Sequence, residues 1–197
     1  GETEELAMSF ALPERGAPWS DIEPRMRELA KGDVKWRDGR TVMYIFNAGP
    51  EVEHVQKTAY AMFASENGLG PAAFPSLAQM EREVVAAGLS LLNAPPGAAG
   101  VMSSGGTDSI FLAVKTARDH ARAKRGFNSG LNIVAPSSVR PAFDKACMVM
   151  DIEMRRIPVK DHLADPAAME AAVDANTLML VGSAPCFPFG LIDPIDE

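Results

Sequence analysis

The feature that most constrains this chain is a pair of adjacent glycines placed directly before a helical pattern. The segment from Gly100 to Lys115 begins with a short apolar run, continues through two serines and the glycines, and then becomes periodic. Apolar residues recur there at the spacing of one helix face: Ile110, Val114 and Ala117. Because glycine has no Cβ, its backbone can turn tightly and approach a ligand closely. The pattern predicts a short strand, a tight turn and a long helix.

The amino end of that helix is a candidate binding site for an anion. The first amides of a helix have no backbone acceptor and lie at the positive end of its dipole, so they favour a group such as phosphate. Ser104 and Thr107 add hydroxyl groups, and Gly105 and Gly106 leave room for a ligand. A turn followed by a helix cap gives the same pattern, so the local sequence leaves both interpretations open. The segment matches neither a Walker A loop nor the G-x-G-x-x-G dinucleotide motif.

Composition indicates a chain that can bury a sizeable core, and it excludes some partners. Of the 197 residues 47% are hydrophobic, and the net charge is -7. An acidic balance argues against nucleic acid as a partner, and no apolar run approaches the length of a membrane span. Cys147 and Cys186 lie in apolar surroundings and do not form a metal-ligand spacing. We therefore expect buried, reduced thiols, no metal site and a cytoplasmic protein.

The chain changes character near residue 98. Before that point we expect an extended arm over residues 1–18, a short apolar run at 42–46, and helices at 20–32, 50–66 and 76–93. Beyond Gly100 short apolar segments alternate with helical ones. The strands are expected at 101–102, 132–135, 153–157 and 178–182, and the helices at 107–125, 141–150 and 166–175. Alternation of this kind predicts a largely parallel sheet flanked by helices.

The predicted sheet brings three loops together. The carboxyl ends of parallel strands meet at one edge, and ligands bind beyond that edge. The loops that follow the expected strands there are 103–107, 137–140 and 183–190. The three histidines, His54, His120 and His162, lie in polar contexts and are expected at the surface. Asp193 and Asp196 are interpreted as cap and turn residues.

Four segments, taken in order, carry a recognisable pattern. They are F-P-S-L-A-Q-M-E at 74–81, S-G-G-T-D-S-I at 104–110, V-A-P-S followed by A-F-D-K-A within 134–146, and V-G-S-A-P followed by G-L-I-D-P-I within 181–195. Together they resemble the sphingosine-1-phosphate lyases and related group II pyridoxal-phosphate decarboxylases. The resemblance runs from about Phe74 to the last residue.

The resemblance implies an α/β fold of the aspartate-aminotransferase type, the fold type I of pyridoxal-phosphate enzymes. Residues 1–98 are then an N-terminal arm and helical segment, and residues 99–197 are the first part of the large domain with its mostly parallel sheet. It also implies a homodimer that binds pyridoxal 5'-phosphate near the subunit interface. The implied reaction is cleavage of a carbon–carbon bond beside an amine, on a small amine substrate that can carry a phosphate.

By analogy with the family, one set of residues is expected to contact the cofactor and one residue the substrate. The cofactor residues are Ser104, Gly105, Gly106, Thr107, Arg140 and Ser183, and Asn67 is expected on the substrate side.

The chain departs from the family pattern in its proton-transfer groups. Arg140 and Phe189 stand where the family motifs have histidines. The family's lysine that binds the cofactor covalently, and the aspartate that pairs with the cofactor ring, lie beyond Glu197. The three lysines nearest the motifs do not match the motif of that lysine and are expected at the surface: Lys115, Lys145 and Lys160. We therefore assign no catalytic residue and expect this chain alone to be inactive.

Three hypotheses stay open from the sequence. The chain is the N-terminal part of a pyridoxal-phosphate lyase or decarboxylase, or a non-catalytic relative that keeps the dimer surface and the phosphate-binding turn, or an unrelated α/β protein that binds a phosphate ester. The substrate also stays open among lipid phosphoamines, amino acids and aspartate-like acids.

Overall fold

The chain divides into two compact units. In the computed structural model, residues 12–41, 45–126 and 129–197 are described. One unit ends at Glu66 and the other runs from Asn67 to Glu197. The predicted arm is described only from residue 12, and it has neither helix nor strand as far as residue 18. The apolar run at 42–46 lies partly outside the described residues, and the expected division at residues 98 and 99 stays a prediction.

The first unit consists of helices whose apolar stripes are exposed. Its elements are α2 (Trp19–Leu29), α3 (Pro50–Met62) and two 3-10 helices, Ala30–Gly32 and Trp36–Asp38. The two α-helices confirm the predicted ones, and none of their residues is buried. Glu53 of α3 accepts hydrogen bonds from Arg37 at 2.8 Å and Lys57 at 2.6 Å. These hydrogen bonds lower the pKa of the Glu53 carboxyl to about 2, and the bond from Arg37 contributes most.

The second unit has the alternating order that the sequence predicts. Its helices are α4 (Pro75–Leu91), α5 (Gly106–Arg125), α6 (Ala142–Met150) and α7 (Pro166–Ala171), and its strands are β1 (Asn132–Pro136), β2 (Glu153–Ile157) and β3 (Thr177–Leu180). The strand expected at 101–102 is wrong, because the segment has no helix or strand. Val101 is 77% and Met102 50% exposed. The two residues have no neighbouring strand to pair with, so their backbone groups form no ladder of hydrogen bonds.

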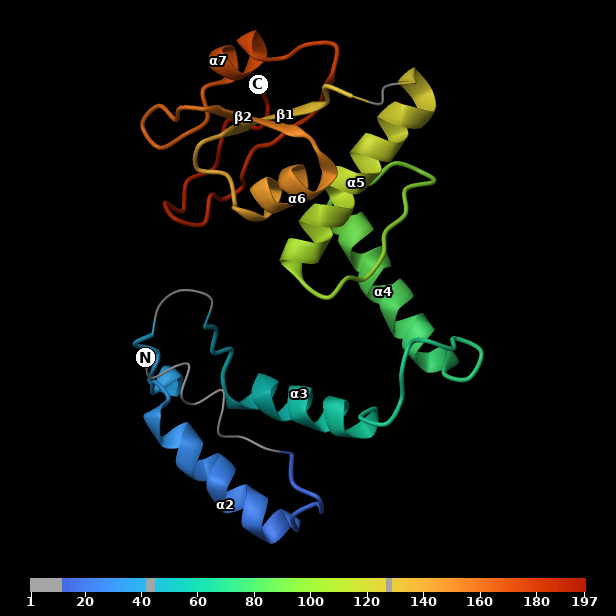
Figure 1. Cartoon of the computed structure of the whole chain (residues 1–197), viewed down its shortest axis with the longest axis vertical. Coiled ribbons are helices and arrows are strands. Elements are labelled where there is room, and N and C mark those ends of the chain that lie inside the picture. The colour runs from blue at the N-terminus through green and yellow to red at the C-terminus, as the bar shows by residue number, and fades with distance from the viewer. Residues whose placement is uncertain (1–11, 42–44, 127–128) are drawn as a thin grey trace. The chain divides into compact units, whose positions relative to one another are not determined.

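The three strands form one parallel sheet in the order β2-β1-β3. Side chains alternate between its faces, as the two-residue repeat of a strand requires. Ile133 and Ala135 pack in the cluster that contains residues of α5 and α6, whereas Val134 packs with Met169 of α7. Figure 1 shows α6 and α7 on opposite sides of the sheet. The helices therefore cover both faces, as a parallel sheet requires.

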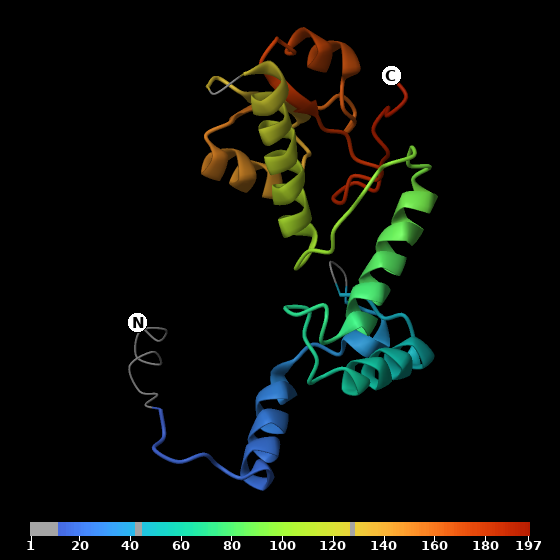
Figure 2. The same ribbon diagram turned by 90° about the vertical axis from the view of Figure 1, so that its right-hand side faces the viewer.

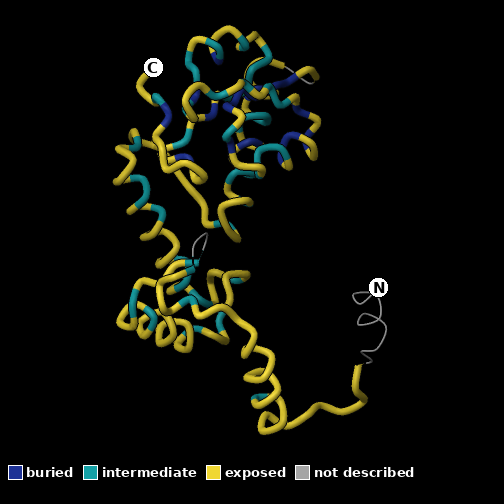
Figure 3. The backbone as a smooth tube through the Cα atoms, turned by 90° about the vertical axis from the view of Figure 1, so that its left-hand side faces the viewer, coloured by how far each residue is buried: buried dark blue, intermediate teal, exposed yellow. Residues whose placement is uncertain are grey.

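The core of the second unit is centred on β1. All five residues of this strand are buried, and Figure 3 shows the buried residues concentrated around the sheet. Asn132 is polar and 0% exposed. Its amide donates to Asp174 Oδ1 at 2.9 Å, and its carbonyl oxygen accepts a hydrogen bond from Thr177 Oγ1 at 2.8 Å. The buried amide is therefore paired at both ends, which removes the cost of placing it in the core.

Both cysteines are free and buried, as the sequence predicts. Burial, with a smaller contribution from the charge of Asp144, raises the pKa of the Cys147 thiol to about 11. Within the described ranges, no helix combines the length and the apolar character needed to cross a membrane.

Replacing Asp174 by asparagine is expected to destabilise the second unit near neutral pH and to have less effect in acid. Hydrogen bonds, first from Asn132 and then from Arg155, lower the pKa of the Asp174 carboxyl from 3.8 to about 2. A carboxyl whose pKa is lower in the folded chain adds stability above its unfolded pKa, and that stability is lost as the pH falls toward the folded value. Urea unfolding at several pH values between neutral and about pH 3 measures the difference.

The matched control is Glu170→Gln on α7, an exposed carboxylate with no ion pair among the described residues. It should leave the unfolding curves unchanged at every pH. A difference between wild type and Asp174→Asn that stays constant down to about pH 3 would contradict the role of the ionised Asp174.

Candidate functional site

The amino end of α5 is an exposed turn. Gly105 precedes the helix at φ 157° and ψ 176°, a backbone region that is essentially restricted to glycine. The helical ladder starts with Ser109 N donating to Gly105 O at 3.0 Å. Among the described residues no acceptor faces the amides of Gly106, Thr107 and Asp108. Because the turn is exposed, these three donors are accessible to a ligand.

Hydrogen bonds inside the turn fix its shape. Ser104 donates to Asp108 Oδ2 through both its amide and its hydroxyl, each at 3.1 Å. The hydroxyls of Ser103 and Ser109 lie 2.6 Å apart. The Asp108 carboxylate also interacts favourably with the positive end of the helix dipole. The Ser104 hydroxyl is thus already engaged, so the groups left for a ligand are the three amides and the Thr107 hydroxyl.

The loops after β1 and β3 contact each other, as predicted for the carboxyl edge of the sheet. Cys186 Sγ donates to Ser138 O at 3.8 Å, and the Arg140 guanidinium carbon lies 5.5 Å from the centroid of the Phe187 ring. Arg140 is exposed. Ser138 Oγ is buried without a hydrogen-bond partner in the described part of the chain. The structure therefore brings Arg140 to the loop that contains Ser183.

Asp193 holds the loop after β3 in place. Its side chain is buried, and its two carboxylate oxygens accept hydrogen bonds from Ala164 N at 2.9 Å and Ser183 N at 2.8 Å. Asp193 N donates in turn to Ser183 O at 2.9 Å. The main chain of Ser183 is thus fixed on both sides, beside the start of α7. Sequence reasoning interpreted Asp193 as a cap or turn residue and missed this buried bridge, because the segment that supplies Ala164 is distant in sequence.

The loop after β2 joins the same edge, which the sequence did not indicate. Lys160 and Leu163 exchange two backbone hydrogen bonds of 2.9 Å, and the residues between them, Asp161 and His162, have φ values of 51° and 68°. The His162 ring lies 4.5 Å from the Phe189 ring, measured between centroids, with the planes tilted by 35°. The loops after all three strands therefore meet around residues 186–190.

The remaining predicted residues have local contacts. Asn67 is exposed, and its side-chain oxygen accepts a hydrogen bond from Leu69 N at 3.1 Å, which shapes its own turn. Lys115 is exposed and pairs with Asp119 at 2.7 Å, and Lys145 and Lys160 are exposed too. No cluster of three potential metal ligands occurs in the described ranges.

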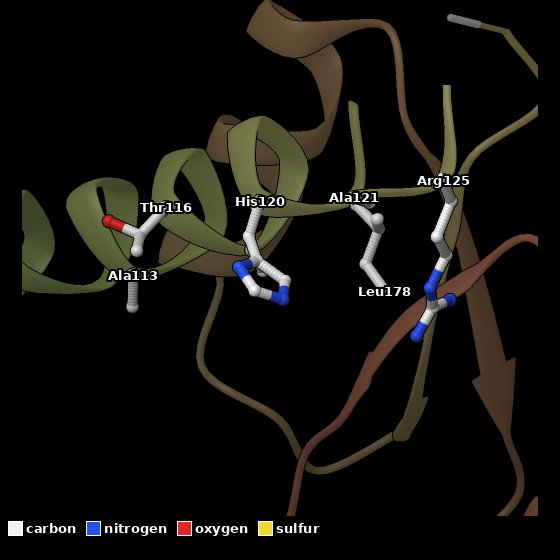
Figure 4. Close-up of a pocket in the computed structure, with 7 residues that line it drawn as sticks. Ala113, Thr116, His120, Ala121, Arg125 and Leu178 are labelled. Carbon is white, nitrogen blue, oxygen red and sulfur yellow. The ribbon is translucent and has the colours of Figure 1, made fainter. Parts of the chain in front are cut away.

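Two hollows lie away from the turn at the start of α5. Figure 4 shows one, of about 520 Å³, beside the middle and the carboxyl end of α5, with His120 and Arg125 among the lining side chains and Leu178 of β3 opposite them. The other, of about 900 Å³, lies between α7, β3 and the last residues. Neither includes Ser104 to Thr107. In Figures 1 and 2 the amino end of α5 and the loop after β3 both lie below the sheet.

Comparison with protein families gives a match over most of the chain. Residues 3–185 match the family described as "Pyridoxal-dependent decarboxylase conserved domain". The sphingosine-1-phosphate lyase 1 of Rattus norvegicus is 38% identical over 187 residues, which are 94% of this chain and 33% of that protein. The sphingosine-1-phosphate lyase of Oryza sativa subsp. japonica is 42% identical over 181 residues, 87% of this chain and 33% of that protein. The chain thus spans about a third of the length of these curated relatives.

Solved structures share the fold. A sphingosine-1-phosphate lyase of Burkholderia pseudomallei K96243 superposes with a TM-score of 0.86 at 36% identity, covering 96% of this chain and 46% of that chain. A glutamate decarboxylase of Lactobacillus brevis superposes with a TM-score of 0.75 at 21% identity, covering 94% of this chain and 43% of that chain. The α/β fold class expected from the sequence is confirmed.

Replacing Asp193 by asparagine is expected to lower the free energy of unfolding by about 2 to 3 kcal/mol. The amide keeps one acceptor oxygen and turns an NH₂ group toward the other backbone donor, so a charge-assisted hydrogen bond is lost and a buried N–H is left unpaired. Urea unfolding followed by circular dichroism gives the value. The control is Asp196→Asn, an exposed carboxylate three residues on, which should change stability by less than about 0.5 kcal/mol. Equal effects of the two substitutions would show that the bridge contributes nothing.

Proposed function

This chain belongs to the pyridoxal-dependent decarboxylase family, and from that premise we propose that it holds the cofactor phosphate of a carbon–carbon lyase. The resemblance found in the sequence is thereby confirmed, and pyridoxal 5'-phosphate is the cofactor of the family. The observation that carries the proposal is the exposed amino end of α5, where three amides face no acceptor within the described residues.

The residues at this turn fit a phosphate group. A phosphate accepts hydrogen bonds from the amides of Gly106, Thr107 and Asp108 and gains from the positive end of the helix dipole. A Cβ added at Gly106 would meet no atom within 4 Å, so the space beside this amide is available for a ligand. The Asp108 carboxylate opposes an anion, and the two hydrogen bonds from Ser104 hold its Oδ2 against that residue.

Each part of the site has a distinct role in the proposal. Pyridoxal phosphate, when bound, supplies a ring that withdraws electrons from the bond to be cleaved. The amides at the start of α5 and the Thr107 hydroxyl hold the phosphate. Ser183, whose main chain is fixed by Asp193, contributes a hydroxyl beside the cofactor. Arg140 can stack on a flat ring or pair with an anion, but it stays charged and so does not transfer protons.

We propose an amine that carries a phosphate as the substrate class, within the wider class of small amine substrates. The relatives of 32% to 42% identity named sphingosine-1-phosphate lyase support this choice, since sphingosine 1-phosphate is itself an amine with a phosphate ester. Amino acids are the alternative, because the family profile and the glutamate decarboxylase fold are compatible with them too. Asn67 stays a proposal for the substrate side.

A homodimer in the cytoplasm completes the proposal. Exposed apolar side chains on α3 and α4 support an interface between subunits: Val52 is 54% exposed, Val55 65%, Val84 58% and Leu91 82%. The two free cysteine thiols support a reducing compartment.

A non-catalytic relative is the second candidate, and one observation favours it. Arg140 and Phe189 occupy the positions of two family histidines, and both side chains are exposed at the edge of the sheet where they would meet a ligand. A protein of this kind would keep the phosphate-binding turn without the proton chemistry of the family.

Replacing Gly106 by aspartate is expected to weaken the binding of a phosphorylated vitamin B6 compound by about tenfold or more. A carboxylate at the first helical position is accepted by the helix dipole but repels a bound phosphate. Pyridoxine 5'-phosphate is the appropriate probe because it lacks the aldehyde that reacts with surface lysines. Phosphorus NMR titration of the purified chain measures its dissociation constant.

The matched control is Gly106→Asn, which has the same shape without the charge and should change the dissociation constant by less than about threefold. Pyridoxine without phosphate tests whether the ester group is the part that binds. Equal dissociation constants for wild type, Gly106→Asn and Gly106→Asp would remove the turn from the proposal.

The 197-residue polypeptide on its own is expected to have no lyase activity with pyridoxal 5'-phosphate and a phosphorylated amine. The three lysines considered from the sequence are exposed, so none has the buried, desolvated setting of a reactive amine. An assay for the aldehyde product tests this expectation. Turnover near the enzyme median of about 10 s⁻¹ would contradict it.

A further inference from the structure

The turn that carries His162 has a backbone better suited to other residues. Two-residue turns with positive φ at both central positions favour Asn-Gly or Asp-Gly, because glycine adopts such angles without steric cost. Here the second central residue is His162 at φ 68°, closed by the two 2.9 Å hydrogen bonds between Lys160 and Leu163. Glycine would satisfy the backbone at this position at least as well as histidine. The backbone of the turn therefore does not by itself require an imidazole there.

The imidazole of His162 is held at the edge of the sheet where the three loops meet. Its ring contacts the Phe189 ring at 4.5 Å, and Arg140 lies over the Phe187 ring at 5.5 Å. The loops after β1 and β2 thus each place a basic side chain on an aromatic ring of the loop after β3. His162 and Arg140 are both exposed, so their nitrogen atoms remain accessible to a ligand.

The basic side chains of these loops differ in whether they are paired with an acid. Arg140 and Lys160 make no ion pair among the described residues, whereas Arg156 is paired with Asp144. Of the acidic groups, Asp193 is occupied by two amides and Asp165 accepts a hydrogen bond from Ala168 N. Asp161, beside His162 in the turn, is the remaining carboxylate. These loops therefore carry Arg140, Lys160 and the imidazole of His162 beside three carboxylates, of which only Asp161 has no hydrogen-bond donor among the described residues.

We propose that His162 is a ligand-contacting residue that, with Arg140, binds the phosphate of the substrate. The imidazole donates a hydrogen bond to a phosphate oxygen, and the guanidinium of Arg140 supplies the charge. The identity of the ligand rests on the function proposed above, in which the turn at the start of α5 holds the cofactor phosphate. The two phosphates are thus bound by different parts of the second unit.

Histidine ring signals in NMR spectra of the purified chain test the contact directly. The chain has three histidines, and His162→Asn identifies the signal of His162 by its loss. Phosphoethanolamine, a small phosphorylated amine, is the probe. It should shift the His162 ring signals in a saturable way and leave those of His54 and His120 in place, whereas ethanolamine should shift none.

Two substitutions separate ligand binding from a structural role. His162→Asn and His162→Gly remove the imidazole and suit a positive φ. Both should weaken phosphoethanolamine binding by about fivefold or more, while the urea midpoint stays unchanged or rises for the glycine variant. Gly106→Asp should leave phosphoethanolamine binding within about twofold, and His162→Asn should leave pyridoxine 5'-phosphate binding unchanged.

Each result decides between the proposals. Unmoved His162 signals, wild-type affinity in His162→Asn, or a lower urea midpoint in His162→Gly would overturn the role of His162. If Gly106→Asp weakens both probes and His162→Asn weakens neither, both phosphates bind at α5, and only the role of His162 fails. If pyridoxine 5'-phosphate does not bind but His162 still responds to phosphoethanolamine, the phosphate-binding role of α5 fails and the anion site at His162 stands.

Discussion

The burial of β1 on both faces is the constraint on which the rest of the second unit depends. A strand can be buried on both faces only if helices pack on each side of the sheet. Here α6 follows β1 and α7 follows β2, and the two helices lie on opposite sides of the sheet. The one polar side chain in the strand, Asn132, is compatible with the core because Asp174 and Thr177 pair with its amide. The end of β1 is therefore a fixed point, and the loop that carries Arg140 starts from it.

The carboxylate of Asp193 extends this order to the exposed edge of the sheet. Loops at such an edge have few apolar contacts of their own, so hydrogen bonds to a buried group determine their path. Asp193 binds the amides of Ala164 and Ser183, which precede α7 and follow β3. A buried carboxylate with one of these donors missing would be costly, so the two segments are fixed together. Residues 186–190, which contact both Arg140 and His162, come shortly after Ser183 in the chain, so the hydrogen bonds of Asp193 to Ser183 fix where this segment begins.

Much of the fold could be predicted from the sequence because its signals are local. The run Glu153–Ile157 forms β2 at the expected bounds, and the helical period after Gly106 gives α5. The prediction of a strand at 101–102 was wrong, because a strand needs a partner strand and a run of two apolar residues does not determine one. At the site, the glycine turn was predictable from spacing, whereas the cofactor proposed for it follows only from the family resemblance. The Asp193 bridge and the contact of His162 with Phe189 join segments distant in sequence, so no local pattern could indicate them.

The two glycines at the start of α5 show which part of the turn the chain itself requires. Gly105 has a backbone conformation restricted to glycine, so the geometry of the helix start explains it without any ligand. That reason does not apply to Gly106, the first residue of α5, which has open space where its Cβ would be. A glycine that neither the backbone nor the packing requires is consistent with a ligand that approaches its amide closely.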